Sequence, residues 1–151
     1  MFLEMEIVME KVTREQALDA LQHGWATYVR RFNKLTPEEQ KVFLARQGFA
    51  RFADLLGHVT AWWQEGEMVI NGILKDPEYK WASYEVDAFN AQAIRRFSDL
   101  DEQDVINSFE LARISFTALV SDLPEEAFKN KKITGWLYAD VVEHLQDHDI
   151  S

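Results

Sequence analysis

Cysteine is absent from the 151 residues of this chain. Its absence excludes disulfide bonds, thiolate metal ligands and a cysteine nucleophile. Any thiol chemistry would therefore use a thiol supplied by a small cofactor. Glycine and proline are scarce, with six and three residues, and no strand–turn–strand signal repeats along the chain. We therefore expect the chain to be built from helices.

Positive charge is also limited. Lysine and arginine together number 16, aspartate and glutamate number 26, and the formal net charge is -10. Since proteins neutralise phosphates with clustered lysine and arginine, this balance argues against a nucleic-acid partner. No segment approaches the ~20 apolar residues of a membrane span, and the first residues lack the pattern of a signal peptide. We therefore expect no membrane partner and a cytoplasmic location.

The rest of the composition is typical of a folded domain. Hydrophobic residues make up 47% and charged residues 28% of the chain, as in globular proteins. Apolar residues recur at steps of three and four, which is the spacing of one helix face. Four segments carry such a stripe: 13–32, 49–74, the residues after Asp101, and 134–148. With short helices between them, they predict one all-α domain over residues 1–151, an antiparallel four-helix bundle.

Local signals mark where these helices begin and end. Thr13 begins a capping-box pattern, and Pro37 stands at the favoured first position of a short helix. Asp101 is a suitable N-cap for the third long helix. The second long helix closes at Asp76, residues 77–86 are expected to form a loop, and a further helix is expected around 86–97.

The four histidines provide the main chemical signal. His144 and His148 are four residues apart in a helical segment, which places both imidazoles on one helix face about 6 Å apart at Cβ. Two neutral imidazoles can share one divalent metal and leave positions for a third ligand and for water. His58, on the second long helix, is the expected third ligand. His23 lies off the apolar stripe of the first helix and is expected at the surface.

Residues around such a site are harder to assign. A ligating histidine usually donates its other N–H to an acceptor, and four acidic residues are candidates: Glu65, Asp87, Glu110 and Asp140. Each is more typical of a solvated surface charge. Asp87 and Asn90 are expected to connect helices through side-chain hydrogen bonds. Four tryptophans, Trp62, Trp63, Trp81 and Trp136, suit either a ligand pocket or the core, and we favour the core.

Three motifs together resemble a known family. They are His58-Val59-Thr60-Ala61-Trp62-Trp63, the Asp-x-x-Asn pattern in 86–90, and His144-x-x-x-His148. Their order and spacing resemble the DinB-like four-helix bundles over nearly the whole chain, and Leu55–Leu123 is most similar to the ClbS/DfsB-like subgroup. The resemblance implies a three-histidine site for zinc or nickel at His58, His144 and His148, and frequent homodimers. Related bundles include transferases and isomerases that use mycothiol or bacillithiol, and proteins that open a strained ring of a DNA-reactive molecule.

These observations lead to one main functional hypothesis and two alternatives. The main hypothesis is a metal-dependent enzyme that acts on a small molecule by hydrolysis or thiol transfer, in detoxification or stress protection. The sequence identifies no catalytic residue beyond the three metal ligands. The alternatives are a non-catalytic protein that sequesters a small ligand, and a helical interaction protein whose histidines are vestigial.

Two further expectations concern surfaces and ends. Trp63, Ile70 and Phe116 are expected to lie partly off the core faces, where a homodimer would cover them. His148 stands three residues before the end of the sequence, so the last helix is expected to fray at this ligand.

Overall fold

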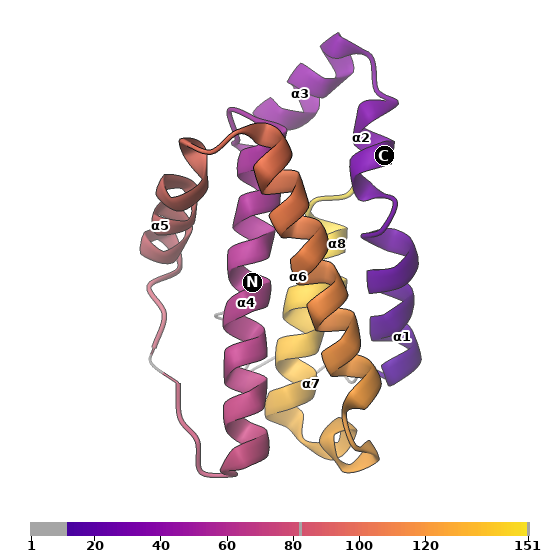
Figure 1. The fold of residues 1–151 in the computed structure, drawn as a ribbon, viewed down its shortest axis with the longest axis vertical. Helices are drawn as coiled ribbons and strands as arrows, with labels where there is room; N and C mark the ends of the chain where they lie inside the picture. The colour runs from indigo at the N-terminus through magenta and orange to yellow at the C-terminus, as the bar shows by residue number, and fades with distance from the viewer. Residues whose placement is uncertain (1–11, 82, 151) are drawn as a thin grey trace.

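The described chain is all-helical, as the sequence predicts. The computed structural model describes residues 12–81 and 83–150, and these residues contain helices and connecting segments but no β-strand. The two longest helices, α4 (Phe52–Lys75) and α6 (Glu102–Asp122), lie side by side along the long axis (Figure 1). None of the described helices combines the length and the apolar character needed to cross a bilayer.

Shorter elements surround this pair. In chain order they are α1 (Arg14–Asp19), the π-helical turn η2 (Ala20–Gly24), α2 (Tyr28–Asn33), α3 (Pro37–Gln47), α5 (Val86–Ser98), the 3₁₀ turn η3 (Glu125–Lys129), α7 (Lys131–Leu137), the π-helical turn η4 (Tyr138–Glu143) and α8 (His144–Asp147). Helix α1 contacts α6 and η4, whereas α7 and η4 contact α4. Helix α5 packs against α4 on the side away from α1 (Figure 1).

Most of the predicted helix ends are confirmed. Thr13 and Thr36 each form a capping box in which the side chain accepts a backbone N–H three residues later. Pro37 is the first residue of α3, and Gly48 ends that helix with a left-handed φ of 80°, which glycine adopts without steric cost. Asp101 is the N-cap of α6, as predicted, although its side chain makes no capping hydrogen bond.

The first and last predicted helices differ most from the expectation, because a π-helical turn interrupts each of them. In the first this turn is η2 (Ala20–Gly24). The last helical segment begins at Lys131, not Thr134, and its π-helical turn is η4 (Tyr138–Glu143). Such turns commonly stand at functional sites. Two buried indoles hold this turn, because Trp25 Nε1 donates to the Val141 carbonyl and Trp63 Nε1 donates to the Asp140 carbonyl, each at 2.9 Å. Residue spacing alone does not reveal such long-range bonds.

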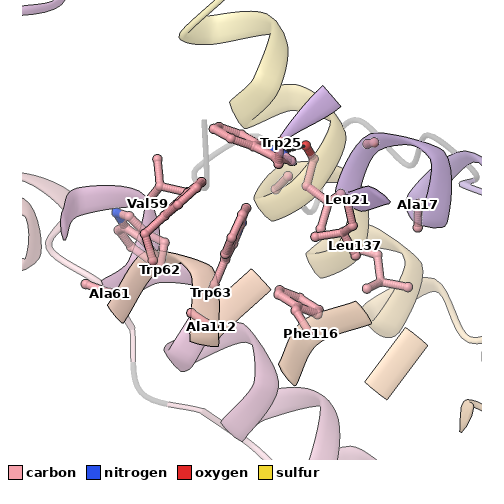
Figure 2. Packing of buried hydrophobic residues seen from close by; sticks show 14 of the residues in the cluster. Ala17, Leu21, Trp25, Val59, Ala61, Trp62, Trp63, Ala112, Phe116 and Leu137 are labelled. Atoms are coloured by element: carbon pink, nitrogen blue, oxygen red, sulfur yellow. Dashed lines mark hydrogen bonds between the residues drawn. The ribbon is translucent and has the colours of Figure 1, made fainter. Parts of the chain in front are cut away.

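Tryptophan side chains form the centre of the core. The Trp63 ring meets the edge of Trp25 at 5.2 Å between centroids and stacks on Phe109 at 5.2 Å. Figure 2 shows Trp25, Trp63 and Phe116 directed toward one another from different helices. Trp62, Trp63 and Trp136 are all fully buried, which confirms the core interpretation for these three. Trp81 is half-buried.

The three residues expected to form a homodimer surface are buried inside the chain. Trp63, Ile70 and Phe116 are each 0% exposed and belong to the core of the chain itself. The expectation that they lie partly off the core is therefore wrong, because α6, α7 and η4 cover the faces of α4 more completely than its own periodicity suggests. The homodimer stays a prediction that these residues no longer support.

We expect Trp63→Phe to lower the free energy of unfolding by about 1–3 kcal/mol, because phenylalanine cannot donate to the buried Asp140 carbonyl. His144 Nδ1 donates to the same carbonyl at 3.2 Å, so the carbonyl keeps one partner and the effect should fall in the lower part of that range. Urea unfolding followed by circular dichroism measures the change. Trp81→Phe is the control, since Trp81 is half-buried, and equal losses in both variants would contradict the role of the indole bond.

Candidate metal centre

Three histidines from two ends of the chain meet in the interior. His58 lies in α4, His144 is the first residue of α8, and His148 directly follows α8 as its C-cap. The ring centroids form a nearly equilateral triangle, with 5.2 Å between His58 and His144 and 5.3 Å for each of the other pairs. The structure thus brings together all three residues that the sequence singles out.

The size of the triangle is compatible with one bound ion. One ring nitrogen from each histidine lies within 4.8 Å of the corresponding nitrogens of the other two. Zinc–nitrogen bonds of about 2.0–2.1 Å place tetrahedral ligand nitrogens roughly 3.4 Å apart. Small side-chain rotations would therefore bring the three nitrogens to ligand distance without a change in the helices.

Hydrogen bonds select the nitrogen that each histidine can offer. His144 Nδ1 donates to the backbone carbonyl of Asp140 at 3.2 Å, and His148 Nδ1 donates to Gln47 Oε1 at 2.6 Å. A carbonyl oxygen only accepts, so both Nδ1 atoms carry the proton and both Nε2 atoms keep the lone pair that a metal needs. His58 interacts with the side chain of Asn90. Each imidazole therefore has a partner of the kind that orients metal ligands.

The protein environment keeps these histidines neutral. Burial lowers the pKa of His58 to about 3, with a smaller contribution from the charge of His148, while Asn90 opposes the change. Burial also lowers the pKa of His148 to about 4. For His144, burial and then the charges of His58 and His148 lower the pKa well below its ordinary value. At neutral pH all three rings are in the form that binds metal.

Residues at the end of α8 are bonded to α2, which counts against the expected fraying; the fraying itself stays a prediction. Tyr28 donates its hydroxyl to the His148 carbonyl at 2.5 Å. Arg31 forms an ion pair with Asp149 at 2.9 Å and donates to the Ile150 carbonyl at 2.7 Å. These bonds come from α2, which is distant in sequence, so the number of residues after His148 does not indicate how firmly this ligand is held.

The expected acidic partners do not have the expected roles. Asp140 contributes its backbone carbonyl, not its carboxylate, to His144, and it is fully buried instead of solvated. Glu65 accepts a hydrogen bond from Tyr84, and Glu110 pairs with Arg113. Asp87 is exposed. The ion pair of Glu110 and the exposure of Asp87 are consistent with their interpretation as surface charges.

Sequence reasoning missed two residues that adjoin the histidines. Gln47 lies at the end of α3, 101 residues before its partner His148, so no local spacing connects them. Phe49 places its ring 5.5 Å from His58 and 6.3 Å from His148 and forms an apolar side of the site.

Asn90 accepts a hydrogen bond from Trp62 Nε1 at 2.8 Å, which confirms that it connects α5 to α4.

We expect Gln47→Leu to weaken metal binding about 10–100-fold, because His148 would lose the acceptor that fixes its Nδ1 proton. Isothermal titration with zinc, on protein purified without a histidine tag, measures the affinity. Gln103→Leu is the matched control, since Gln103 is exposed and bonds to Asn107 on the same helix. Unchanged affinity in Gln47→Leu would show that Gln47 does not orient a metal ligand.

The fourth histidine is separate from this site. His23 is 76% exposed at its side chain and pairs with Asp19 at 2.9 Å in the first helical segment. The expectation that it lies at the surface is confirmed. His23 is therefore a natural control position for experiments on the buried histidines.

Comparisons with known proteins do not extend this description. No protein-family model, no curated protein and no solved structure matches the chain. The function must therefore be inferred from the chemistry of the three histidines and their surroundings.

Proposed function

We propose that the protein is a DinB-like four-helix bundle that binds zinc or nickel at His58, His144 and His148 and acts on a small molecule by hydrolysis or thiol transfer. One observation supports it most strongly. Three buried, neutral imidazoles converge, and each has a hydrogen-bond or electrostatic partner within the protein. A histidine that only packs in a core has no need of two further histidines whose ring nitrogens converge on the same point.

The bundle part of the proposal has support from the helix contacts. Helix α4 contacts α6, α6 contacts α1, α1 contacts η4, and η4 contacts α4. Figure 1 shows α4, α6, α1 and the α7–α8 segment lying next to one another along the long axis. Buried tryptophans belong to the core of these elements. These contacts support the proposal of a four-helix bundle whose first and last helices are interrupted. The order of the histidine motifs along these helices supports the resemblance to the DinB-like family.

The donor set defines the chemistry that the site suits. Three neutral imidazoles favour a zinc, nickel or iron ion over calcium or magnesium, which prefer oxygen ligands. Such an ion, when bound, lowers the pKa of a coordinated water or thiol or polarises a carbonyl group. The residues of the chain would hold the ion, orient the ligand rings through Gln47 and Asp140, and exclude bulk water through Phe49. Detoxification or stress protection would be consistent with such an activity.

The proposal is tested by metal content and turnover together. Protein purified without a histidine tag should contain close to one equivalent of a transition metal by mass spectrometry of the element. With that metal it should accelerate hydrolysis of nitrophenyl acetate, or the reaction of chlorodinitrobenzene with a low-molecular-weight thiol. Metal binding without turnover of either probe would favour the ligand-sequestering alternative. Absence of any metal binding would refute the proposed centre.

A further inference from the structure

A buried acid stands one helical turn before the histidine site. Asp140 lies in η4 and is 0% exposed. Neither of its carboxylate oxygens has a hydrogen-bond partner among the described residues. Buried polar groups almost always have such a partner, and a buried carboxylate is the most costly to leave alone. The position therefore calls for a group that residues 12–81 and 83–150 do not supply.

The backbone of α4 is shaped to receive this carboxylate. A Cβ atom at Gly66 would lie 2.0 Å from Asp140 Oδ2 and 3.6 Å from the Trp136 ring. Glycine at this position therefore allows the acid to lie directly against the helix. The preceding residue, Glu65, is partly buried and interacts electrostatically with Asp140. Asp140 therefore lies against Gly66 of α4, next in sequence to an acid whose charge acts on it.

A group of aromatic rings contacts Glu65 and extends to Trp136, which lies beside Gly66. Tyr84 donates its hydroxyl to Glu65 Oε2 at 2.6 Å, and its ring lies 5.7 Å from Trp136 and 5.5 Å from Trp62. Trp81 meets the edge of Trp136 at 5.8 Å. Tyr84 and Trp81 are partly exposed, so this group of rings extends from the buried acid to the surface.

We propose that Asp140 and Glu65, with the rings of Tyr84, Trp81 and Trp136, form a subsite for the ammonium group of a small organic amine. The Glu65 carboxylate attracts a cation, and aromatic faces add a further favourable interaction with it. The ammonium group would also supply the partner that the buried Asp140 lacks, with the Asp140 proton released to solvent as the cation binds. The subsite takes an organic cation and not calcium or magnesium, which need six or more oxygen ligands or retained waters. It does not depend on a metal at the three histidines.

The chain already contains an example of the same interaction. Lys132, at the start of α7, places its Nζ 6.0 Å from the centroid of the Trp81 ring. The Trp81 ring that this amine meets is partly exposed, whereas Asp140 is fully buried. An alkylammonium ion is therefore a suitable probe, because it combines the charge of a lysine side chain with a short apolar part that can pack between the rings.

The test is titration calorimetry with butylammonium chloride, with chelator present so that metal plays no part. Butanol and sodium chloride are the controls for the apolar and ionic parts of the probe. We expect the parent to bind butylammonium, and Asp140→Asn and Glu65→Gln each to weaken binding about 10-fold or more, since each variant loses a carboxyl group that is ionised beside the bound ammonium. Glu67→Gln is the matched control, because Glu67 lies on the same helix but bonds to Ser115.

Several outcomes would overturn the subsite. These are no binding by the parent, equal binding of butanol, or affinities in Asp140→Asn and Glu65→Gln that equal that of the parent. If Asp140→Asn does not fold, Glu65→Gln decides alone, because Glu65 is only partly buried. A loss of binding in Glu67→Gln as large as in Glu65→Gln would also refute it. Because chelator is present, these results are separate from success or failure at the metal centre.

Discussion

Lowering the pH from about 7 to 4 is expected to reduce the free energy of unfolding of the metal-free protein by about 3–6 kcal/mol. The pKa of His58 falls to about 3 and that of His148 to about 4 in the folded chain. Burial also lowers the pKa of His144 well below its ordinary value. In the unfolded chain each titrates near its ordinary value of 6.5. Below that pH the unfolded state binds more protons than the folded state, so acid favours unfolding.

Asp140 acts in the opposite direction. Burial, and then the charge of Glu65, raise its pKa well above the ordinary value of 3.8. Above that value the unfolded carboxyl has lost a proton that the folded one keeps, so this group lowers stability as the pH rises. Each shifted group changes the free energy by up to about 1.4 kcal/mol per pH unit. Three histidines opposed by one acid leave a net loss of stability toward acid.

Urea unfolding at half-unit steps of pH measures this dependence. His148→Ala should show a shallower slope than the parent between pH 6.5 and 4, whereas His23→Ala should keep the slope of the parent because His23 is exposed. Asp140→Asn should steepen the slope, since it removes the opposing group. A stability that stays constant between pH 7 and 4 would show that the three buried histidines are not held neutral.

Replacing any one of the three central histidines by alanine is expected to abolish the stabilisation that zinc or nickel provides. A metal that binds only the folded state raises its stability by about 2.7 kcal/mol at a concentration 100 times the dissociation constant. The affinity loss in His58→Ala, His144→Ala or His148→Ala should exceed the roughly 10–100-fold loss expected for changes in the residues that orient ligands. Gln47→Leu should therefore be intermediate between these variants and the parent.

Thermal unfolding near neutral pH, with metal or with chelator, measures this effect. The difference between the two conditions is the informative quantity, because alanine at a buried histidine also leaves a cavity and lowers stability by itself. His23→Ala controls for adventitious binding at the surface. Equal responses to metal in the parent and in His144→Ala would refute the three-histidine centre, and with it the physical basis of the proposed enzyme.

The sequence by itself determined the helical class and most helix positions. Capping boxes at Thr13 and Thr36 act over three residues, and apolar stripes repeat over one or two turns, so both signals are local. The same locality explains why His144 and His148 could be placed on one face. The choice of His58 as their neighbour depended on motif order and on its position in an apolar face, and the structure brings the three rings together.

Only the tertiary structure decided how these residues are held. The π-helical turn at Tyr138–Glu143 is bonded by indoles from two other segments, and Gln47 orients His148 across 101 residues of sequence. The burial of Asp140 requires the absence of a side chain at Gly66 on another helix. None of these features has a local pattern, because each depends on groups that become neighbours only after the helices pack. A carboxylate has the same sequence signature whether it faces water or the core, and packing alone separates the two.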